Sequence, residues 1–551
     1  MSVFAPDTDL RLVKCPLTYG DGHQLDFATA AAQATYFSGL TGKAYTDFSY
    51  QRKDHIIRIP DLAENIYPYN YVMYRNKSSA KWFYAFITKI EFINQNCTHV
   101  HIRTDVFQTW MFDFSFKQCL VEREHTPTDN FAEHTLPENV TTGGVREINR
   151  SNALTYSLKN MVSTDFEANY RVLFVCSEAV TALGGASTVG QIRLGAVPTA
   201  CYYYGVERLH VRDAVDALVT AGKIDTVLTV YCVPIGALNW VSVMTSPFNV
   251  WLALDHKYDI TSLPMKTEYS HLSYFGTNIK NRKCLLYPYH FYRLSSGNGQ
   301  SIDLKPQYFE ATTIYIKSWF DGNCAPSIIA YPTQYETTGT GDNWGGATPL
   351  NNYVTYANFP DVPYTVDVYE RYLAENKTTL EYRQIKFLFD TTMIPFGGLD
   401  ASLAASDSSK TDIGSGVAKG LYGKAMELAE FEAGMRDLER RPDKVVGTPS
   451  GSVQMLSGNG GIWLSEMCIR PEYLRIVDDY FTMYGYKVMR VKTPQFTSRP
   501  NHNFLKTIDC DLTGEMPQDD EDELKAMFNA GLTVWHNPAT FGNYSVNNAP
   551  T

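Results

Sequence analysis

The side chains that could bind a metal ion are few, and they do not form a complete ligand set. His99 and His101 lie two residues apart, so both rings would project from the same face of a β-strand. Two imidazoles could share a zinc ion, but a zinc site needs further ligands, and the sequence offers no third one nearby. We therefore interpret the pair as part of a polar, exposed strand face and expect neither a metal nor a cofactor.

Residues Asp519–Asp522 form an acidic run that invites a calcium interpretation. An EF-hand loop alternates its ligands and carries a central glycine, and this run does neither. Carboxylates in the first turn of a helix interact favourably with the helix dipole. The run therefore predicts the start of a helix over residues 519–532 and not an ion site.

Motifs that mark catalytic or nucleotide-binding sites are absent from the sequence, which has no HExxH, GxSxG or P-loop. The stretch TGTGDNWGG within 337–352 lacks the preceding strand and following helix of a phosphate-binding loop, so we predict a surface loop there. A carboxylate pair for glycoside hydrolysis has no fixed spacing, and the chain contains 59 acidic residues. We predict a protein that is not an enzyme, with glycoside hydrolysis left open as an alternative.

The composition indicates a large, folded, β-rich protein. A chain of 551 residues is too long for one hydrophobic core, so three or four structural units are expected. Aromatic residues make up 13% of the chain, including 37 tyrosines, and they suit the pleated surface of a sheet. The formal net charge of −11 argues against a protein that binds nucleic acid tightly through clustered Lys and Arg side chains.

The cysteine pattern and the apolar runs bear on where the chain folds. Ten cysteines are scattered without a CxxC pair, which favours reduced thiols in a protein that folds in a cytosol. The first residues lack the basic start and apolar core of a signal peptide. No run approaches the roughly 18–20 apolar residues of a membrane-spanning helix. We expect a chain that is made soluble, with any membrane contact following a conformational change or assembly.

The elements that would position these side chains begin with an antiparallel hairpin over residues 81–104. Two alternating runs flank a turn at 94–96, and such alternation predicts one buried and one solvent-exposed face. Asp105 is placed to cap a short helix at 106–112. In the first strand, one predicted face carries Phe86, Thr88, Ile90 and Phe92, and the other carries Lys89 and Glu91.

Strings near the two ends of the chain carry a resemblance to a known family. They are WFYAFIT, DVFQTWMF and VEREH within residues 1–145, and YGYKVMRVKTP, LKTIDC, AGLTVWH and GNYSVNN within 465–551. In this order and spacing they resemble the tail knob (distal tail tube) protein of small, short-tailed phages of Gram-positive bacteria, the Bacillus-type picovirus family. The residues that carry the resemblance are Trp82, Phe83, Tyr84, Asp105, Gln108, Thr109, Trp110, Arg123, Glu124, His125, Tyr484, Gly485, Tyr486, Trp535, His536, Gly542, Asn543 and Tyr544.

The resemblance implies a mainly β (α+β), multi-domain architecture. Segments 1–145 and 465–551 would together form a β-barrel-like tube domain, residues 146–389 would form inserted knob domains, and 390–464 would be a long internal loop. Six copies would close into a ring, since a head-to-tail interface either closes or grows into a filament. An acidic lumen would repel the phosphate backbone of DNA and favour its passage.

The loop at 390–464 is the stretch to which the resemblance gives a specific role. In the family, the corresponding loop is long and apolar, blocks the lumen and is released to help breach the host membrane. Residues 421–438 repeat apolar positions in steps of three and four, which predicts one stripe of a helix ending at Pro442. The apolar candidates are Met393, Ile394, Phe396, Leu399, Leu403, Ile413, Val417, Leu421, Tyr422, Met426, Leu428, Phe431, Met435 and Leu438.

The loop also carries charge, including Glu427, Glu430, Arg436 and Arg440. Burying so many charges in hydrocarbon is very costly, whereas an amphipathic helix at an interface, or six helices bundled apolar side inward, costs much less. We therefore expect a lumen plug in preference to a membrane-spanning pore, with an exposed flexible linker as the alternative.

The remaining expectations concern partners and rival functions. The resemblance implies a virion protein assembled in the host cytoplasm as a homohexamer. Its partners would be the lower collar (connector) protein, a cell-wall-degrading tail-tip protein, genomic double-stranded DNA passing through the lumen, and the host membrane. Two alternative functions from other classes stay open. One is a receptor-binding tail appendage, which a trimeric assembly would support, and the other is a cell-wall glycoside hydrolase.

Overall fold

The computed structural model describes most of the chain, in two compact units. The described residues are 8–46, 49–51, 54–76, 81–138, 140, 143–156, 158, 166–184, 191–194, 197–245, 248–321, 326–335, 352–357, 359, 361–362 and 460–550. Unit 1 is drawn from Met1–Gly144, Thr267–Leu286 and Ile469–Thr551, and unit 2 from Val145–Lys266 and Tyr287–Cys468. The apolar candidates in the 390–464 loop all lie outside the described residues.

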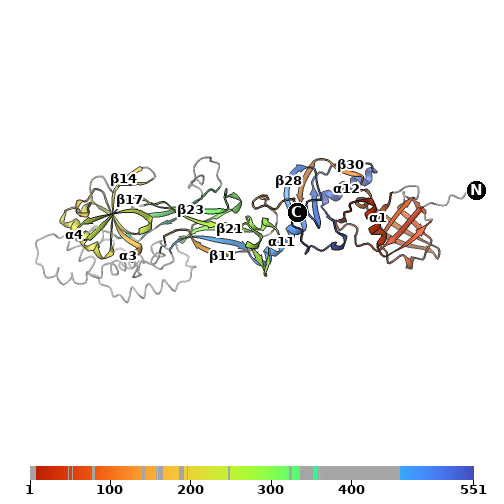
Figure 1. Cartoon of the computed structure of the whole chain (residues 1–551), viewed down its shortest axis with the longest axis horizontal. Coiled ribbons are helices and arrows are strands. Elements are labelled where there is room, and N and C mark those ends of the chain that lie inside the picture. Colours follow the sequence, from red (N-terminus) through yellow and green to blue (C-terminus); the bar gives the residue numbers. More distant parts are fainter. Residues whose placement is uncertain are drawn as a thin grey trace, which may run out of the picture. The chain divides into compact units, whose positions relative to one another are not determined.

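The first part of unit 1 is a seven-stranded antiparallel sheet that curves into a half-barrel (Figure 1). Its order is β3-β1-β6-β7-β8-β5-β4, and helix α1 (Ala30–Gly39) packs beside it. Alternating residues fill one core inside the curve, with Leu12 and Val100, and a second core outside it, with Phe37 and Tyr71. The strands are β1 (Thr8–Val13), β3 (Gly42–Thr46), β4 (Ser49–Gln51), β5 (Ile56–Ile59), β6 (Tyr71–Asn76), β7 (Phe83–Asn94) and β8 (Cys97–Thr104).

The hairpin predicted over 81–104 is confirmed as β7 and β8, but the predicted faces of its first strand are wrong. The ladder register shifts between Ile87 and Lys89, which is a β-bulge that turns the following side chains over. Phe86 therefore packs in the outer core, whereas Ile90 packs against the inner one. The expectation of one wet face also fails at the start of β7, where Tyr84, Ala85 and Phe86 are all buried because both faces are covered.

The second part of unit 1 is a five-stranded sheet of order β2-β31-β29-β10-β28. Strand β2 pairs parallel with β31 and the other neighbours are antiparallel. The strands are β2 (His23–Leu25), β10 (Cys119–Glu124), β28 (Tyr486–Lys492), β29 (His502–Thr507) and β31 (Leu532–Trp535). A two-stranded sheet, β9 (Phe114–Phe116) with β30 (Leu512–Gly514), lies beside it, and β19 (Ser273–Tyr274) pairs with β20 (Thr277–Asn278).

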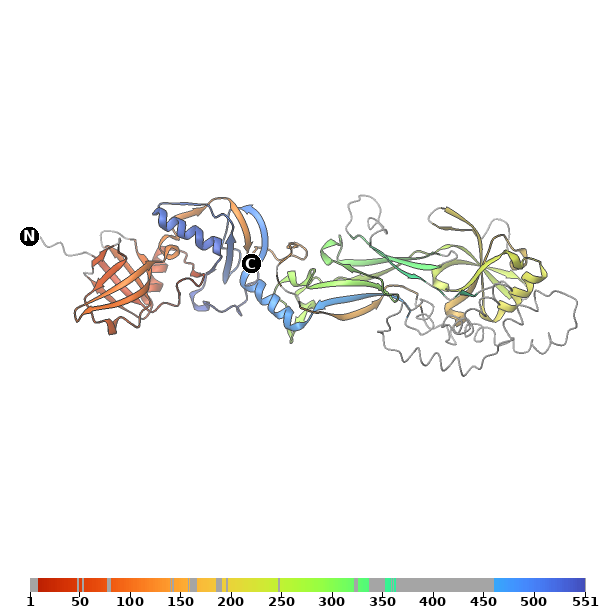
Figure 2. The same cartoon turned by 180° about the vertical axis from the view of Figure 1, so that it is seen from behind.

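Helices cover both faces of this five-stranded sheet. Helix α2 (Val106–Trp110) and helix α12 (Gln518–Ala530) share a core with Val121 and Leu505 on one face. The other face meets helix α11 (Pro471–Tyr484), whose Tyr484 ring lies 5.1 Å from that of Phe504. Leu505 and Phe504 point to opposite faces because successive strand residues alternate. In both views α12 and α11 lie on either side of the strands (Figures 1 and 2).

The described residues of unit 2 form three further sheets. Their orders are β16-β17-β14-β12-β15-β26 with β13 paired to β14, β11-β27-β21-β22, and β18-β23-β24-β25. The elements are β11 (Val145–Asn152), α3 (Phe166–Asn169), β12 (Tyr170–Cys176), β13 (Gln191–Leu194), β14 (Val197–Val206), α4 (Val211–Thr220), β15 (Val227–Pro234), β16 (Leu238–Thr245), β17 (Phe248–His256), β18 (Asp259–Pro264), β21 (His290–Ser296), β22 (Ser301–Leu304), β23 (Thr313–Asp321), β24 (Ser327–Thr333), β25 (Val354–Ala357), β26 (Asp361–Val362) and β27 (Ile462–Ile469).

The coarse fold prediction is confirmed, since the chain is mainly β, with several sheets, few helices and more than one unit. The helix predicted over 519–532 is α12, and the short helix capped by Asp105 is α2. Within the described part of the chain, no helix combines the length and the apolar character needed to cross a bilayer.

Candidate functional site

The five-stranded sheet is the place where distant parts of the sequence are bonded together. Strand β31 lies between β2 and β29, with His23 opposite Thr533 and Asn503 opposite Val534. Strand β10 lies between β29 and β28 in the same way. Residues near position 24 and near position 534 are therefore held in one hydrogen-bonded layer.

Trp535 and His536 anchor the end of the chain to its beginning. The indole of Trp535 is fully buried, and its Nε1 donates a hydrogen bond to His23 Nδ1 at 3.0 Å. The Tyr544 ring packs 5.0 Å from it. The His536 ring lies between Asp26 Oδ2 and Asn503 Oδ1, each at 2.9 Å. Both family-motif residues thus act as tethers within unit 1.

Two histidines meet near the C-terminal end of α11. His125 and His502 are both buried, and the Nε2 atom of each lies about 3 Å from the carbonyl oxygen of Thr482, at 3.1 and 3.0 Å. The backbone N–H of Phe504 donates to His125 Nδ1 at 2.7 Å, so that ring carries its proton on Nε2. Burial lowers the pKa of His502 to about 4 and lowers the pKa of His125 well below its ordinary value. Both rings are therefore neutral at pH 7.

A buried ion cluster lies between the sheet and α11. The Arg123 guanidinium donates to the carbonyl oxygen of Gly485 at 2.7 Å and stacks over the Tyr480 ring. Arg123 and Lys283 both form ion pairs with the carboxylate of Glu138, which is also buried. Burial lowers the pKa of Lys283, and the neighbouring Glu138 carboxylate raises it only partly. One carboxylate thus pairs with two cations that come from different parts of the sequence.

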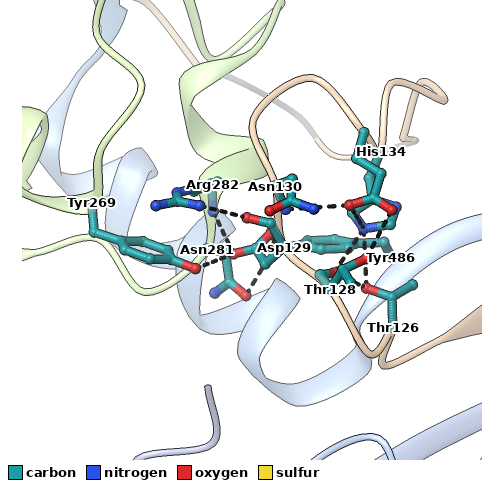
Figure 3. Close-up of polar contacts among 10 residues, drawn as sticks. Thr126, Thr128, Asp129, Asn130, His134, Tyr269, Asn281, Arg282 and Tyr486 are labelled. Atoms are coloured by element: carbon teal, nitrogen blue, oxygen red, sulfur yellow. Dashed lines mark hydrogen bonds and ion pairs between the residues drawn. The ribbon is translucent and has the colours of Figure 1, made fainter. Parts of the chain in front are cut away.

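A second network, shown in Figure 3, is centred on Asp129. The hydroxyl of Tyr486 donates to Asp129 Oδ1 at 2.6 Å, and that of Tyr269 donates to Oδ2 at 2.8 Å. The backbone N–H of Arg282 donates to the same Oδ2 at 3.0 Å. Burial and the nearby Asp129 carboxylate raise the pKa of Tyr486 well above its ordinary value. The network fastens segment 267–286 to β28 and to the loop after β10.

Asp105 and Gln108 form a third polar centre, between the half-barrel and the five-stranded sheet. Asp105 caps α2 by accepting the backbone N–H of Gln108 at 3.1 Å, and it accepts hydrogen bonds from Gln24 Nε2 and the Tyr71 hydroxyl. Gln108 Nε2 donates to the carbonyl oxygen of Leu25 at 2.8 Å. Burial raises the pKa of Asp105 to about 6. These side chains are saturated by structural partners.

The other family-motif residues also have structural positions. Phe83 and Tyr84 lie in the cores of the half-barrel, and the Arg75 guanidinium stacks over Trp82 at 4.5 Å. Glu124 is buried and pairs with the Lys492 ammonium at 2.7 Å. Three further contacts involve motif residues: Thr109 Oγ1 bonds the backbone of Tyr84, Trp110 Nε1 donates to Asp520, and Asn543 donates its backbone N–H to the carbonyl oxygen of Thr540.

A pocket of about 400 Å³ opens on the face of the five-stranded sheet that meets α11. Its lining residues are Glu122, Arg123, Glu138, Tyr480, Tyr484, Lys487, Phe504 and Lys506. The Lys506 ammonium pairs with Glu122 at 2.8 Å. Among the residues that the structure describes, no cluster of three or more His, Cys, Asp or Glu side chains is arranged to hold a metal ion.

Sequence reasoning found part of this site and missed the rest. It singled out Arg123, Tyr484 and Tyr486 through the family strings, but not their partners. The missed residues are Asp129, Glu138, Tyr269, Arg282, Lys283 and His502. No periodicity marks them, because His502 is the first residue of β29 and the others lie in loops or short 3-10 turns.

Comparison with known proteins places these features in a family. The family described as Bacillus phage phi29, Tail knob protein gp9, C-terminal domain, matches residues 255–549. The family described as Caudoviral major tail protein N-terminus matches residues 7–115. "Tail knob protein gp9" of Bacillus phage B103 is 25% identical over 548 residues, covering 89% of both chains, and that of Bacillus phage phi29 is 26% identical over 548 residues, covering 88% of both.

A solved structure agrees at the level of the fold. The bacteriophage C1 tail knob protein, gp12, superposes with a TM-score of 0.63 at 16% identity, covering 98% of this chain and 99% of that one. The gp9 domain family alone matches more than half of the chain. The chain therefore belongs to the tail knob protein gp9 family of phi29-like Bacillus phages and is a structural component of a phage tail.

Proposed function

We propose that this protein is the subunit of a hollow, homohexameric tail knob through which the genome passes during ejection. Segments 1–145 and 465–551 build the tube wall, residues 146–389 form the knob, and the chain has no enzymatic activity. The observation that carries the proposal is the five-stranded sheet, in which β31 is bonded on one side to β2 and on the other to β29. A wall made from both ends of a chain requires such a layer.

The acidity of the chain supports the passage of DNA. With a net charge of −11 per subunit, a hexamer repels the phosphate backbone over any surface where acidic residues prevail. A duplex can then slide without being bound. One end of the tube docks on the lower collar protein, and the other holds a cell-wall-degrading tip protein. These partners follow from the family resemblance.

The oligomer gives the most direct test. Negative-stain images of the purified protein are expected to show a hollow ring with six-fold symmetry. A solid trimer would favour a receptor-binding appendage and a monomer would also contradict the proposal. Turnover of cell-wall polysaccharide that is lost on mutation of one carboxylate pair would contradict its non-enzymatic part.

The role of residues 390–464 as a lumen plug, which also helps to penetrate the host membrane, needs its own experiment. Phage carrying a deletion of residues 393–458 are expected to assemble but to leak DNA or fail to infect. A matched control replaces the same residues with a polar Gly/Ser linker of equal length, which keeps the connection and removes the apolar stripe. Normal infectivity of the linker variant would remove the plug role and identify the segment as a spacer.

A further inference from the structure

The five-stranded sheet of unit 1 has an inner face covered by α12 and an outer face that is covered only at one end. Val121 and Leu505 point to the inner face, where they pack against Leu524 and Phe528 of α12. Their neighbours along the strands point to the outer face. There, α11 covers the end near Phe504, and the sheet beyond it carries exposed side chains.

The covered end of the outer face forms the pocket of about 400 Å³ described above. Its walls are the rings of Tyr480, Tyr484 and Phe504. Its cations outnumber its carboxylates, because Lys487 and Lys506 lie at the pocket in addition to Arg123 and Lys283, which share the single carboxylate of Glu138. Lys506 is paired with Glu122, whereas the Lys487 ammonium has no ion pair among the residues that the structure describes. Aromatic rings beside cations are typical of the centre of a protein–protein interface.

An apolar strip continues from this pocket to the edge of the sheet. Leu120 on β10 lies opposite Val491 on β28, and the backbone N–H of Ile508 donates to the carbonyl oxygen of Leu120 at 3.0 Å. The three side chains are therefore neighbours on the outer face. Val491 is 69% exposed and Ile508 is 49% exposed. Adjacent exposed aliphatic side chains beside a charged pocket mark a contact surface for another protein.

The chain itself presents a surface of complementary charge. The first turn of α12 carries Asp519, Asp520 and Glu521, and Asp522 follows directly. Asp520, Glu521 and Asp522 have partners within the same copy, which are Trp110, Lys525 and Gln518. The side chains of Asp519 and Asp522 are nevertheless exposed. Because α12 packs on the inner face, the sheet separates this acidic turn from the pocket of its own copy.

We infer that the acidic first turn of α12 in one copy docks on the cationic, aromatic pocket of a second copy, with the strip of Leu120, Val491 and Ile508 completing the contact. The two surfaces are different and lie on opposite faces of one sheet, so the contact is head-to-tail. A head-to-tail contact that closes makes a ring. The inference rests on the proposed hexamer and names the surfaces that hold it together.

Charge reversal on each surface tests the inference. The pocket variant is Lys487→Glu with Lys506→Glu, and the helix variant is Asp519→Lys with Asp522→Lys. In each variant the pocket of one copy and the α12 turn of the next carry charges of the same sign and repel each other. Each variant is therefore expected to raise the protein concentration at which rings form by at least about tenfold. Circular dichroism confirms the fold of each variant. The control, Lys14→Glu with Lys89→Glu on the half-barrel, makes the same change in net charge as the pocket variant and is expected to assemble like the wild type.

Restoration of the ring is the sharper result. A chain carrying all four substitutions has both surfaces reversed and is expected to assemble again. An equimolar mixture of the pocket variant and the helix variant is also expected to form rings, in which the two variants alternate, because each then meets its complement. Size-exclusion chromatography with light scattering and negative-stain imaging measure both outcomes.

The outcomes separate this inference from the function on which it rests. If the wild type forms no ring, the proposed function fails. If the wild type forms rings and the pocket variant does so at the same concentration, the inference is overturned and the hexamer stands. Rings that form normally but are no longer incorporated into tails would also overturn it, because the pocket would then hold a different tail protein.

Discussion

The neutral, buried ring of His502 predicts a defined loss of stability in acid. A histidine whose pKa is about 4 in the folded state and about 6.5 unfolded binds more protons when the chain is unfolded. Its contribution to the free energy of unfolding is therefore complete above pH 6.5 and falls as the pH decreases from 6.5 to 4. Integrating between pH 8 and pH 5 gives a loss of about 2 kcal/mol from this one group.

The wild-type profile alone cannot isolate this effect, because other buried groups titrate in the same range. Burial of Asp105 raises its pKa to about 6, so its contribution changes with the opposite sign. The comparison is therefore with His502→Gln, which keeps a donor near the carbonyl oxygen of Thr482 and does not titrate. The stability difference between wild type and variant is expected to shrink by about 2 kcal/mol from pH 8 to pH 5.

The measurement is unfolding in urea, with hydrogen exchange in peptides that cover β29 and β31 as the readout. These peptides report on unit 1 separately from unit 2. His99→Gln, on β8 of the half-barrel, controls for the substitution itself. A difference between wild type and His502→Gln that stays constant over this pH range would refute the reasoning, since it would show that the ring is not held neutral.

Three further substitutions test other contacts. Glu138→Gln leaves its two buried cations without a counter-charge, and the free energy of unfolding of unit 1 is expected to fall by about 3–5 kcal/mol in urea. Gly485→Ala places a methyl group 2.1 Å from the carbonyl oxygen of Glu124 at a φ of 63°, so a loss of at least about 3 kcal/mol is expected. Gly299→Ala, at a φ of 87° with open space around it, is the matched control and should cost only about 1 kcal/mol by thermal unfolding. Trp535→Phe removes the hydrogen bond to His23 and some buried area, and a loss of about 1–3 kcal/mol by the same assay is expected. Unchanged stability of Glu138→Gln or Trp535→Phe, or equal effects of the two glycine substitutions, would contradict these assignments.

The elements that depend on local pattern could be predicted from the sequence. Alternation over 81–104 identified the hairpin, and the acidic first turn identified α12. The bulge after Ile87 could not be predicted, because nothing in the residue types distinguishes a shifted register from a regular one. The bulge moved Ile90 to the opposite face from Phe86.

The polar networks could not be predicted for a different reason. Asp129 meets Tyr269 across 140 positions and Tyr486 across 357 positions of the sequence. Each such contact depends on the completed fold and leaves no local pattern. The family strings contain Tyr486 and Arg123. They give no information on the loop residues whose polar groups bond to these two side chains.

The strand order of the five-stranded sheet has a consequence for synthesis of the subunit on the ribosome. Strand β31 ends at residue 535 and separates β2 from the remaining strands, so the layer stays interrupted until residue 535 has been translated. Truncated products that end before this strand cannot complete the layer. Translation as far as residue 535 is thus a precondition for the folding of this layer, because shorter chains lack the strand that joins β2 to β29.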